Sequence, residues 1–330
     1  MYPGAVPSPS LPVIDVSELR GGDPAPAARA IAEACQETGF FYAVNHGVDT
    51  DLIESLEALA REFFAWSLEN KLAQRMELGG RAWRGYFPIG AELTSGQPDN
   101  KEGLYFGAEL PTSDPRVRAG KPLHGPNQFP PLPGFRAAVL DTIAALTDLG
   151  HVLAGGISLS LDLPVDFLAT RYTRDPLVLF RLFSYPPLLT GAEQWSVGEH
   201  TDYGLLTILH QDDAGGLQIK SHGEWIDAPP VPNSFVCNIG DMLDRLTGGR
   251  YRSTPHRVLN ASDQTRLSMP FFFDPNMEAS VEPIWPDEPP LEEDSERWDH
   301  ASVHLFEGTY GDYLLAKVSR VFPALGEKAL

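Results

Sequence analysis

The spacing of apolar residues divides the chain into helical and strand-like segments. Apolar side chains recur every three or four residues, which is the helical period, in four segments. These segments are residues 26–38, 51–68, 134–161 and 306–320. The segment 134–161 is long and apolar enough to need a sheet or a bundle to pack against. We therefore expect one long core helix and three shorter helices.

Short apolar or alternating runs, typical of β-strands, make up most of the second half of the chain. They cover residues 177–184, 204–210, 216–219, 234–239, 256–259 and 266–273, and turn-rich linkers separate them. Two more strand-like segments, 11–19 and 39–48, lie near the N-terminus. This spacing predicts an antiparallel sandwich or barrel. Residues 79–134, rich in Gly, Pro and Asn, are expected to form loops that could build a pocket wall.

Composition adds an expectation about the cellular compartment. A chain of 330 residues can bury a large core without disulfides. Its two cysteines, Cys35 and Cys237, lie far apart in apolar stretches, as expected of buried thiols in a reducing compartment. The N-terminus lacks a basic segment followed by an apolar one, and no apolar run approaches the roughly 20 residues that span a bilayer. We therefore expect a cytoplasmic protein without a membrane-spanning segment.

The charge balance limits the classes of partner. The net charge is −20, and so acidic a surface repels nucleic-acid backbones and anionic lipids. Nucleic acids and membranes are therefore not expected as partners. A local cationic pocket for a small carboxylate ligand remains compatible with this charge. We expect a monomer or weak homodimer that acts on a small molecule.

Three His-x-Asp or His-x-Glu pairs are candidate metal sites. Residues i and i+2 of a strand point to the same face, so such a pair can place an imidazole and a carboxylate on one cation. One pair alone is weak support, because chance yields roughly one in a chain with this many acidic residues. The pairs are His200 and Asp202, His210 and Asp212, and His222 and Glu224; a helical pair, His300 and His304, is a fourth candidate.

Residues further along the chain favour the first pair. His256 lies in a strand-like segment and can supply a third ligand, and about ten residues later Arg266 and Ser268 form another i, i+2 pair. Two histidines and one carboxylate leave three positions open on an octahedral ion, as in non-haem iron(II) oxygenases. A bidentate 2-oxo acid and then dioxygen can fill them, while Arg266 offers a planar fork, and Ser268 a hydroxyl, to the distal carboxylate. We therefore predict iron(II) at His200, Asp202 and His256.

Segments spread over nearly the whole chain match a known family. They are PVIDVSEL, GFFYAVNHGV, SYPP, GEHTDYGLLTIL, GGLQI, NIGDMLDRLTGGRYRSTPHRV and RLSMPFFFDP. In these segments the chain resembles the isopenicillin N synthase-like branch of the 2-oxoglutarate/iron(II) dioxygenases. The resemblance implies a mixed α and β fold with a double-stranded β-helix (jelly-roll) core and flanking helices. Residues 1–130 are then expected to form a mixed α/β region that packs on the core. Residues 131–330 hold the long helix, the jelly roll and the C-terminal helix, all within one structural unit.

The resemblance also implies roles for individual residues. Arg266 and Ser268 would bind the carboxylate of 2-oxoglutarate, and Tyr185 would donate a further hydrogen bond to this co-substrate. The chain departs from the family at one position, because the asparagine of the family's N-x-Y-P stretch is Phe183 here. A polar contact to the co-substrate is therefore expected to be missing.

The implied reaction is oxidation of a small organic metabolite by an iron(IV)-oxo species. Dioxygen and 2-oxoglutarate would be consumed, succinate and CO2 would be released, and ascorbate can serve as reductant. Hydroxylation is the default outcome, and the sequence does not separate it from desaturation, epoxidation or cyclisation. Two alternatives stay open. One is a 2-oxoglutarate-independent oxidase of the isopenicillin N synthase or aminocyclopropane carboxylate oxidase type, and the other is a non-catalytic jelly-roll binding protein.

Strand alternation predicts where the substrate lies. If Arg266 and Ser268 face the interior of the barrel, Phe272 shares that face and lines the substrate pocket. Ordinary core packing is the alternative for this phenylalanine. Three more substrate-facing candidates are Leu217, where the family lines its cavity, and Arg84 and Tyr86 from the loop region 79–134.

Overall fold

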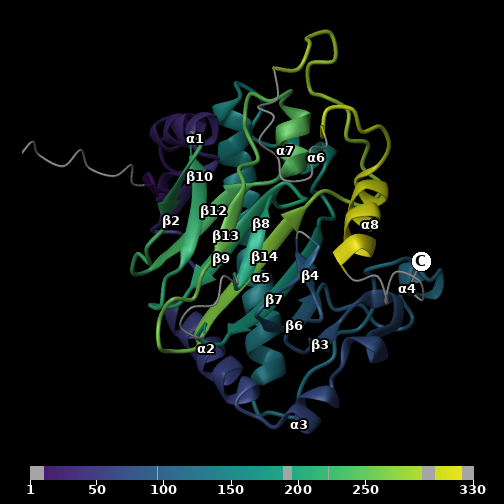
Figure 1. Cartoon of the computed structure of the whole chain (residues 1–330). Helices are drawn as coiled ribbons and strands as arrows, with labels where there is room; N and C mark the ends of the chain where they lie inside the picture. The colour runs from purple at the N-terminus through teal and green to yellow at the C-terminus, as the bar shows by residue number, and fades with distance from the viewer. Residues whose placement is uncertain (1–10, 95, 189–194, 222, 292–301, 322–330) are drawn as a thin grey trace, which may run out of the picture.

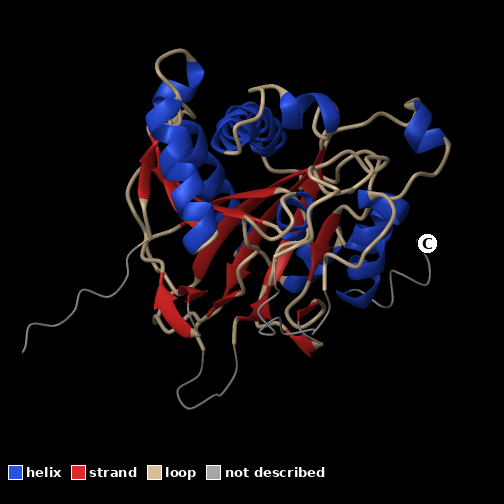
Figure 2. Ribbon diagram, turned by 90° about the horizontal axis from the view of Figure 1, so that it is seen from above, coloured by secondary structure: helices blue, strands red, loops and turns tan. Residues whose placement is uncertain are grey.

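Two β-sheets form the centre of the molecule. The computed structural model describes residues 11–94, 96–188, 195–221, 223–291 and 302–321. The strands form one eight-stranded sheet, which combines both halves of the chain, one four-stranded sheet from the second half, and a separate two-stranded hairpin (Figure 1). Seen from above, the longest helices lie together on one side of the strands (Figure 2).

The eight-stranded sheet has the order β1-β2-β12-β9-β14-β7-β6-β3. Only the β1–β2 pairing is parallel, and the other pairings in this sheet are antiparallel. Four of the strands come from the N-terminal region, so that region is hydrogen-bonded into the same sheet as the later strands. The strands are β1 Val13–Asp15, β2 Phe40–Val44, β3 Gly85–Phe87, β6 Glu102–Gly107, β7 Leu177–Tyr185, β9 Leu206–Gln211, β12 Ser234–Ile239 and β14 Arg266–Asp274.

The four-stranded sheet has the order β11-β10-β13-β8 and is antiparallel throughout. Its strands are β8 Val197–His200, β10 Leu217–Ser221, β11 Glu224–Asp227 and β13 His256–Val258, and the separate hairpin consists of β4 Leu93–Thr94 and β5 Gln97–Pro98. Side chains from both main sheets line one cavity. This cavity is the interior of a double-stranded β-helix, which confirms the predicted fold class.

The helices cover the large sheet. The long helix α5 packs against α1 and α2 and contacts β7, β9 and β14. By its length and composition this helix could cross a membrane, which the sequence prediction overlooked. Half of its most apolar stretch is, however, buried in the fold. It is therefore a core helix. The α-helices are α1 Ala25–Glu37, α2 Thr50–Phe64, α3 Leu68–Leu72, α4 Pro115–Arg118, α5 Phe135–Ser160, α6 Phe167–Arg171, α7 Asp241–Leu246 and α8 Tyr310–Val321, and the 3-10 helices are η1 Ser17–Arg20 and η2 Met76–Ala82.

Most predicted elements are confirmed within a few residues at their ends. The four predicted helices correspond to α1, α2, α5 and α8, and the predicted strands to β1, β2, β7, β9, β10, β12, β13 and β14. The prediction of loops across 79–134 was wrong in part, because β3 and β6 lie there and β6 pairs with β7. Glycines at both ends of the apolar segment of β6 hide its strand pattern. Cys35 and Cys237 are buried free thiols, as predicted.

Candidate metal centre

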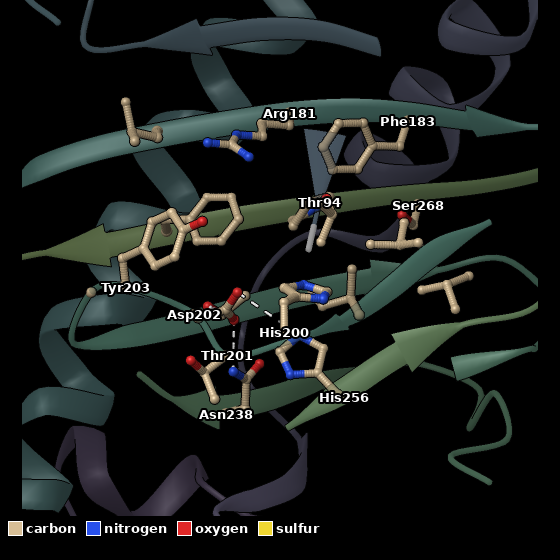
Figure 3. Close-up of a pocket in the computed structure, with 18 of the residues that line it drawn as sticks. Thr94, Arg181, Phe183, His200, Thr201, Asp202, Tyr203, Asn238, His256 and Ser268 are labelled. Atoms are coloured by element: carbon tan, nitrogen blue, oxygen red, sulfur yellow. Dashed lines mark hydrogen bonds and ion pairs between the residues drawn. The ribbon is translucent and has the colours of Figure 1, made fainter. Parts of the chain in front are cut away.

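Three side chains with metal-ligating atoms meet at one end of the four-stranded sheet. His200 ends β8, and His256 begins β13 directly opposite it in the strand pairing. Asp202 follows the end of β8 by two residues. One ligand atom from each of the three side chains lies within 4.8 Å of the other two. Figure 3 shows the three groups turned toward one another in the cavity.

Backbone carbonyls orient both imidazoles. His200 Nδ1 lies 2.9 Å from the carbonyl oxygen of Gly198, and His256 Nδ1 lies 3.2 Å from that of Thr254. When Nδ1 carries the proton and donates it to a carbonyl, Nε2 keeps its lone pair for a metal. Burial, with a further contribution from neighbouring His256, lowers the pKa of His200 to about 3. This imidazole is therefore neutral at physiological pH, as a metal ligand must be.

The predicted co-substrate residues lie together in the same cavity. Arg266 on β14 is opposite Tyr185 on β7, and the Tyr185 hydroxyl is 3.1 Å from the hydroxyl of Ser268. Arg266 is fully buried, and its Nε donates to the carbonyl oxygen of Gly215 at 2.6 Å. Its Nη1 has no hydrogen-bond partner among the described residues. A buried guanidinium nitrogen without a partner, beside two hydroxyls, fits a carboxylate ligand.

Strand alternation extends this inner face along β14. Ser268, Pro270 and Phe272 line the cavity with Arg266. Phe271 between them is fully buried in the core on the other face. The ring of Phe272 is only partly buried, as expected of a cavity wall. Leu217 on β10 lines the cavity as well.

Comparison with known proteins agrees with this geometry. The family model for the non-haem dioxygenase in morphine synthesis N-terminal region matches residues 11–132, and that for the 2OG-Fe(II) oxygenase superfamily matches residues 166–275. A Dictyostelium discoideum protein named "Probable iron/ascorbate oxidoreductase" is 47% identical, with 97% of each chain covered. The chain belongs to the 2-oxoglutarate/iron(II) oxygenases.

Two other relatives and a solved structure bear on the chemistry. A 1-aminocyclopropane-1-carboxylate oxidase of Dictyostelium mucoroides is 40% identical, with 95% of both chains covered. A homoarginine-6-hydroxylase of Arabidopsis thaliana is 37% identical, with 95% of this chain and 98% of the relative covered. The crystal structure of a full-length Neurospora crassa protein in complex with alpha-KG has a TM-score of 0.77 and 28% identity, with 94% of this chain and 96% of that chain covered. This oxygenase accordingly uses iron(II) and 2-oxoglutarate and acts on a small molecule.

The structure does not bring Arg84 and Tyr86 to the cavity of the oxygenase, so their prediction as substrate contacts is corrected. Arg84 is buried, and its Nη2 donates to the carbonyl oxygen of Leu123 at 2.9 Å. The Tyr86 hydroxyl donates to Glu102 Oε2 at 2.6 Å. The physical reason is sheet order, because β3 is an edge strand and β6 separates it from β7. Both side chains belong to the packing of the N-terminal region.

The sequence prediction missed several polar residues of the cavity, among them Thr207 and Asn238 of the large sheet and four residues on a second wall. Arg181 comes from β7, and Glu92, Thr94 and Lys101 come from the segment around the β4–β5 hairpin. Arg181 had a visible signal, since it is a lone charge within an apolar strand, four residues before Tyr185. The other three had none, because only the tertiary fold carries their segment to the cavity. The broad expectation that 79–134 builds a pocket wall is nevertheless confirmed.

Phe183 occupies the position of the family's asparagine and lines the cavity. The ammonium group of Lys101 lies 4.8 Å from the centre of its ring. A cation therefore stands near the place where a polar contact was expected to be missing.

The alternative histidine pairs have other environments. His210 Nε2 lies 3.1 Å from Glu57 Oε2, and Asp212 pairs with Arg61 at 2.7 Å. Neither His210 nor Asp212 lines the cavity of the oxygenase. His222 and His300 lie outside the described residues, so their pairs stay untested.

Proposed function

We propose that His200, Asp202 and His256 hold one iron(II) ion in this oxygenase, and that Arg266, Ser268 and Tyr185 hold the distal carboxylate of 2-oxoglutarate. The observation that carries this proposal is the buried Arg266 Nη1 without a partner among the described residues, in the same cavity as the three converging ligands. The donor set also fits, because two imidazoles and one carboxylate suit non-haem iron(II) and leave positions open.

The residues of the chain bind and orient, while iron, when bound, supplies the activation of dioxygen. Arg266 offers a planar pair of donors to the carboxylate, and the hydroxyls of Ser268 and Tyr185 lie on the same side. Phe272 and Leu217 are proposed to form apolar walls that exclude water and hold the substrate near the metal. Hydroxylation of a C–H bond is the expected outcome.

The test is to supply the purified protein with iron(II), ascorbate and 2-oxoglutarate and to screen small metabolites for stimulated release of succinate. Omitting 2-oxoglutarate is the control. Product formed without any 2-oxo acid would favour an oxidase of the type for which the Dictyostelium mucoroides relative is named. Succinate release that requires both iron and 2-oxoglutarate supports the proposal.

We further propose that the protein acts in the cytoplasm on a free metabolite, as a monomer or weak homodimer. The net charge of −20 supports the absence of nucleic-acid partners. Sedimentation velocity of the metal-loaded protein tests the oligomeric state.

A further inference from the structure

A second arginine lines the cavity and is not among the residues proposed to hold iron or 2-oxoglutarate. Arg181 lies in the middle of β7, and Figure 3 shows its guanidinium group on the wall across from His256. The centre of this group lies 4.1 Å from the ring centre of Tyr105 and 4.7 Å from that of Phe272. Its Nε has no hydrogen-bond partner among the described residues. Contacts with the two rings restrict the guanidinium group before any ligand binds.

Arg181 is too far from Arg266 to share the same co-substrate molecule. Arg266 is paired with Tyr185, and Arg181 lies four residues before Tyr185 on the same strand. Four residues of a strand span about 13 Å, whereas the carbon chain of 2-oxoglutarate spans about 5 Å. The two arginines therefore mark two separate anion positions in one cavity.

A carboxylate lies beside Arg181. Glu92 Oε1 is 3.7 Å from Arg181 Nη1 and accepts a hydrogen bond from the Tyr105 hydroxyl at 2.7 Å. Glu92 Oε2 lies 3.0 Å from Lys101 Nζ in an ion pair, and a carboxylate oxygen with one such partner can accept a second hydrogen bond. The wall thus offers a guanidinium nitrogen without a partner among the described residues and, close to it, a carboxylate oxygen that can accept a second hydrogen bond.

The basic and acidic side chains of this wall are equal in number. They are Arg181 and Lys101 on one side, and Glu92 and Asp99, which pairs with Lys101 at 2.6 Å, on the other. A ligand that brought only a carboxylate, or only an ammonium group, would leave one buried charge without compensation, which is costly. A zwitterion leaves the balance unchanged, because its carboxylate can accept from Arg181 and its ammonium group can donate to Glu92.

We propose that Arg181 and Glu92 bind the carboxylate and the ammonium group of a free amino acid, which is the substrate of this oxygenase. The inference rests on the proposed function, because the rest of the amino acid must extend from this wall toward the metal. It passes Phe272 and Leu179, which line the cavity between the strands. Arg181 and Glu92 are therefore specificity-determining residues.

The experiment uses the iron-loaded protein with 2-oxoglutarate and the standard L-amino acids, with succinate release as readout. For the amino acid that stimulates release most, the acid without its amino group and the amine without its carboxylate are then tested as competitive inhibitors. Arg181→Gln should raise the KM of the amino acid at least about thirtyfold. It should also weaken inhibition by the acid, but not inhibition by the amine. Glu92→Gln should raise the KM of the amino acid and weaken inhibition by the amine, but not inhibition by the acid.

Matched variants separate binding from folding. Arg136→Gln is the control, because Arg136 also pairs with a glutamate and lies over a phenylalanine ring, but outside the cavity. Arg136→Gln should leave the binding of the amino acid, the acid and the amine unchanged. If Arg181→Gln does not fold, Arg181→Lys takes its place as the test variant. It keeps the charge but loses the planar fork, so it should weaken the amino acid and the acid in the same way, but less strongly.

Two results would overturn the inference. One is that Arg181→Gln and Glu92→Gln lower the melting temperature but affect the amino acid, the acid and the amine equally, which indicates a structural ion pair. The other is that the wild-type protein responds to no amino acid while it still converts 2-oxoglutarate to succinate. Failure of the proposed function would look different, because the iron-loaded wild type would then neither bind 2-oxoglutarate nor release succinate with any compound.

Discussion

The side-chain amide of Asn238 donates a hydrogen bond to Oδ2 of Asp202 at 2.7 Å. Thr207 donates to the same oxygen at 2.5 Å. Oδ1 of Asp202 is left on the side of His256, whose Nε2 lies 3.8 Å away. Two donors from the large sheet thus fix the carboxylate of the third proposed metal ligand.

We predict that Asn238→Ala weakens iron(II) binding by about 10- to 100-fold, because the carboxylate of Asp202 loses one of the two bonds that orient it. Anaerobic titration with iron(II) measures this affinity. Asn70→Ala, at an exposed position of α3, is the control and should bind iron as the wild type does. Unchanged affinity in Asn238→Ala would mean that Thr207 alone is enough to hold the carboxylate.

Arg266→Ala should raise the KM for 2-oxoglutarate by the equivalent of roughly 2 to 5 kcal/mol, because it removes the charged partner of a buried carboxylate. Arg266→Lys should restore only part of the loss, since an ammonium group lacks the planar fork. Succinate release as a function of 2-oxoglutarate concentration measures both. An unchanged KM in Arg266→Ala would place the co-substrate elsewhere.

The neighbours Phe271 and Phe272 offer a matched pair on opposite faces of β14. Phe271→Ala should cost about 3 to 5 kcal/mol of unfolding free energy, as for a fully buried aromatic ring. Phe272→Ala should cost less and should uncouple succinate release from product formation, because its ring lines the cavity. Urea unfolding and the ratio of product to succinate separate the two. Equal destabilisation with normal coupling in Phe272→Ala would remove it from the substrate site.

Asp274 should make the folded protein less stable as the pH rises. Burial raises its pKa from 3.8 to about 7, although the Tyr310 hydroxyl donates to it at 2.5 Å. Between about pH 4 and 7 the folded state therefore binds more protons at this group than the unfolded state. Its stabilising contribution is present below pH 4 and is lost as the pH rises through 7.

We compare the free energy of unfolding of Asp274→Asn with that of the wild type. We predict that the variant gains on the order of 1 to 4 kcal/mol relative to the wild type when the pH rises from 5 to 8. Urea unfolding of the metal-free proteins at both pH values gives this difference. Asp141→Asn on the exposed face of α5 should show no such change. If Asp274→Asn and the wild type differ in free energy of unfolding by the same amount at both pH values, the pH dependence arises from another group.

The sequence was most informative where a short, strict period governs the structure. The two-residue alternation of β14 carries the inner face from Arg266 to Phe272, and the strand pairing brings His256 beside His200. The same rule applied to β7 would have identified Arg181, because Tyr185 was already a site candidate.

The spacing of apolar residues gave no information about side chains whose position depends on tertiary packing. Arg84 and Tyr86 follow a loop-like pattern, yet they lie on or beside an edge strand that β6 screens from the cavity. Glu92 and Lys101 have no local signal, since only the path of the β4–β5 segment brings them to the cavity wall. Residues that depend on the path of a long connection could not be assigned from the sequence.

The iron content of single-residue variants tests the central claim most directly. We expect one iron(II) per chain in the wild type and almost none in His200→Ala, Asp202→Ala and His256→Ala, with circular dichroism unchanged because a jelly roll does not need a metal to fold. His210→Ala, from the other described His-x-Asp pair, is the control and should keep a full iron content. Full iron content in His256→Ala, or its loss in His210→Ala, would contradict the assignment of the metal centre.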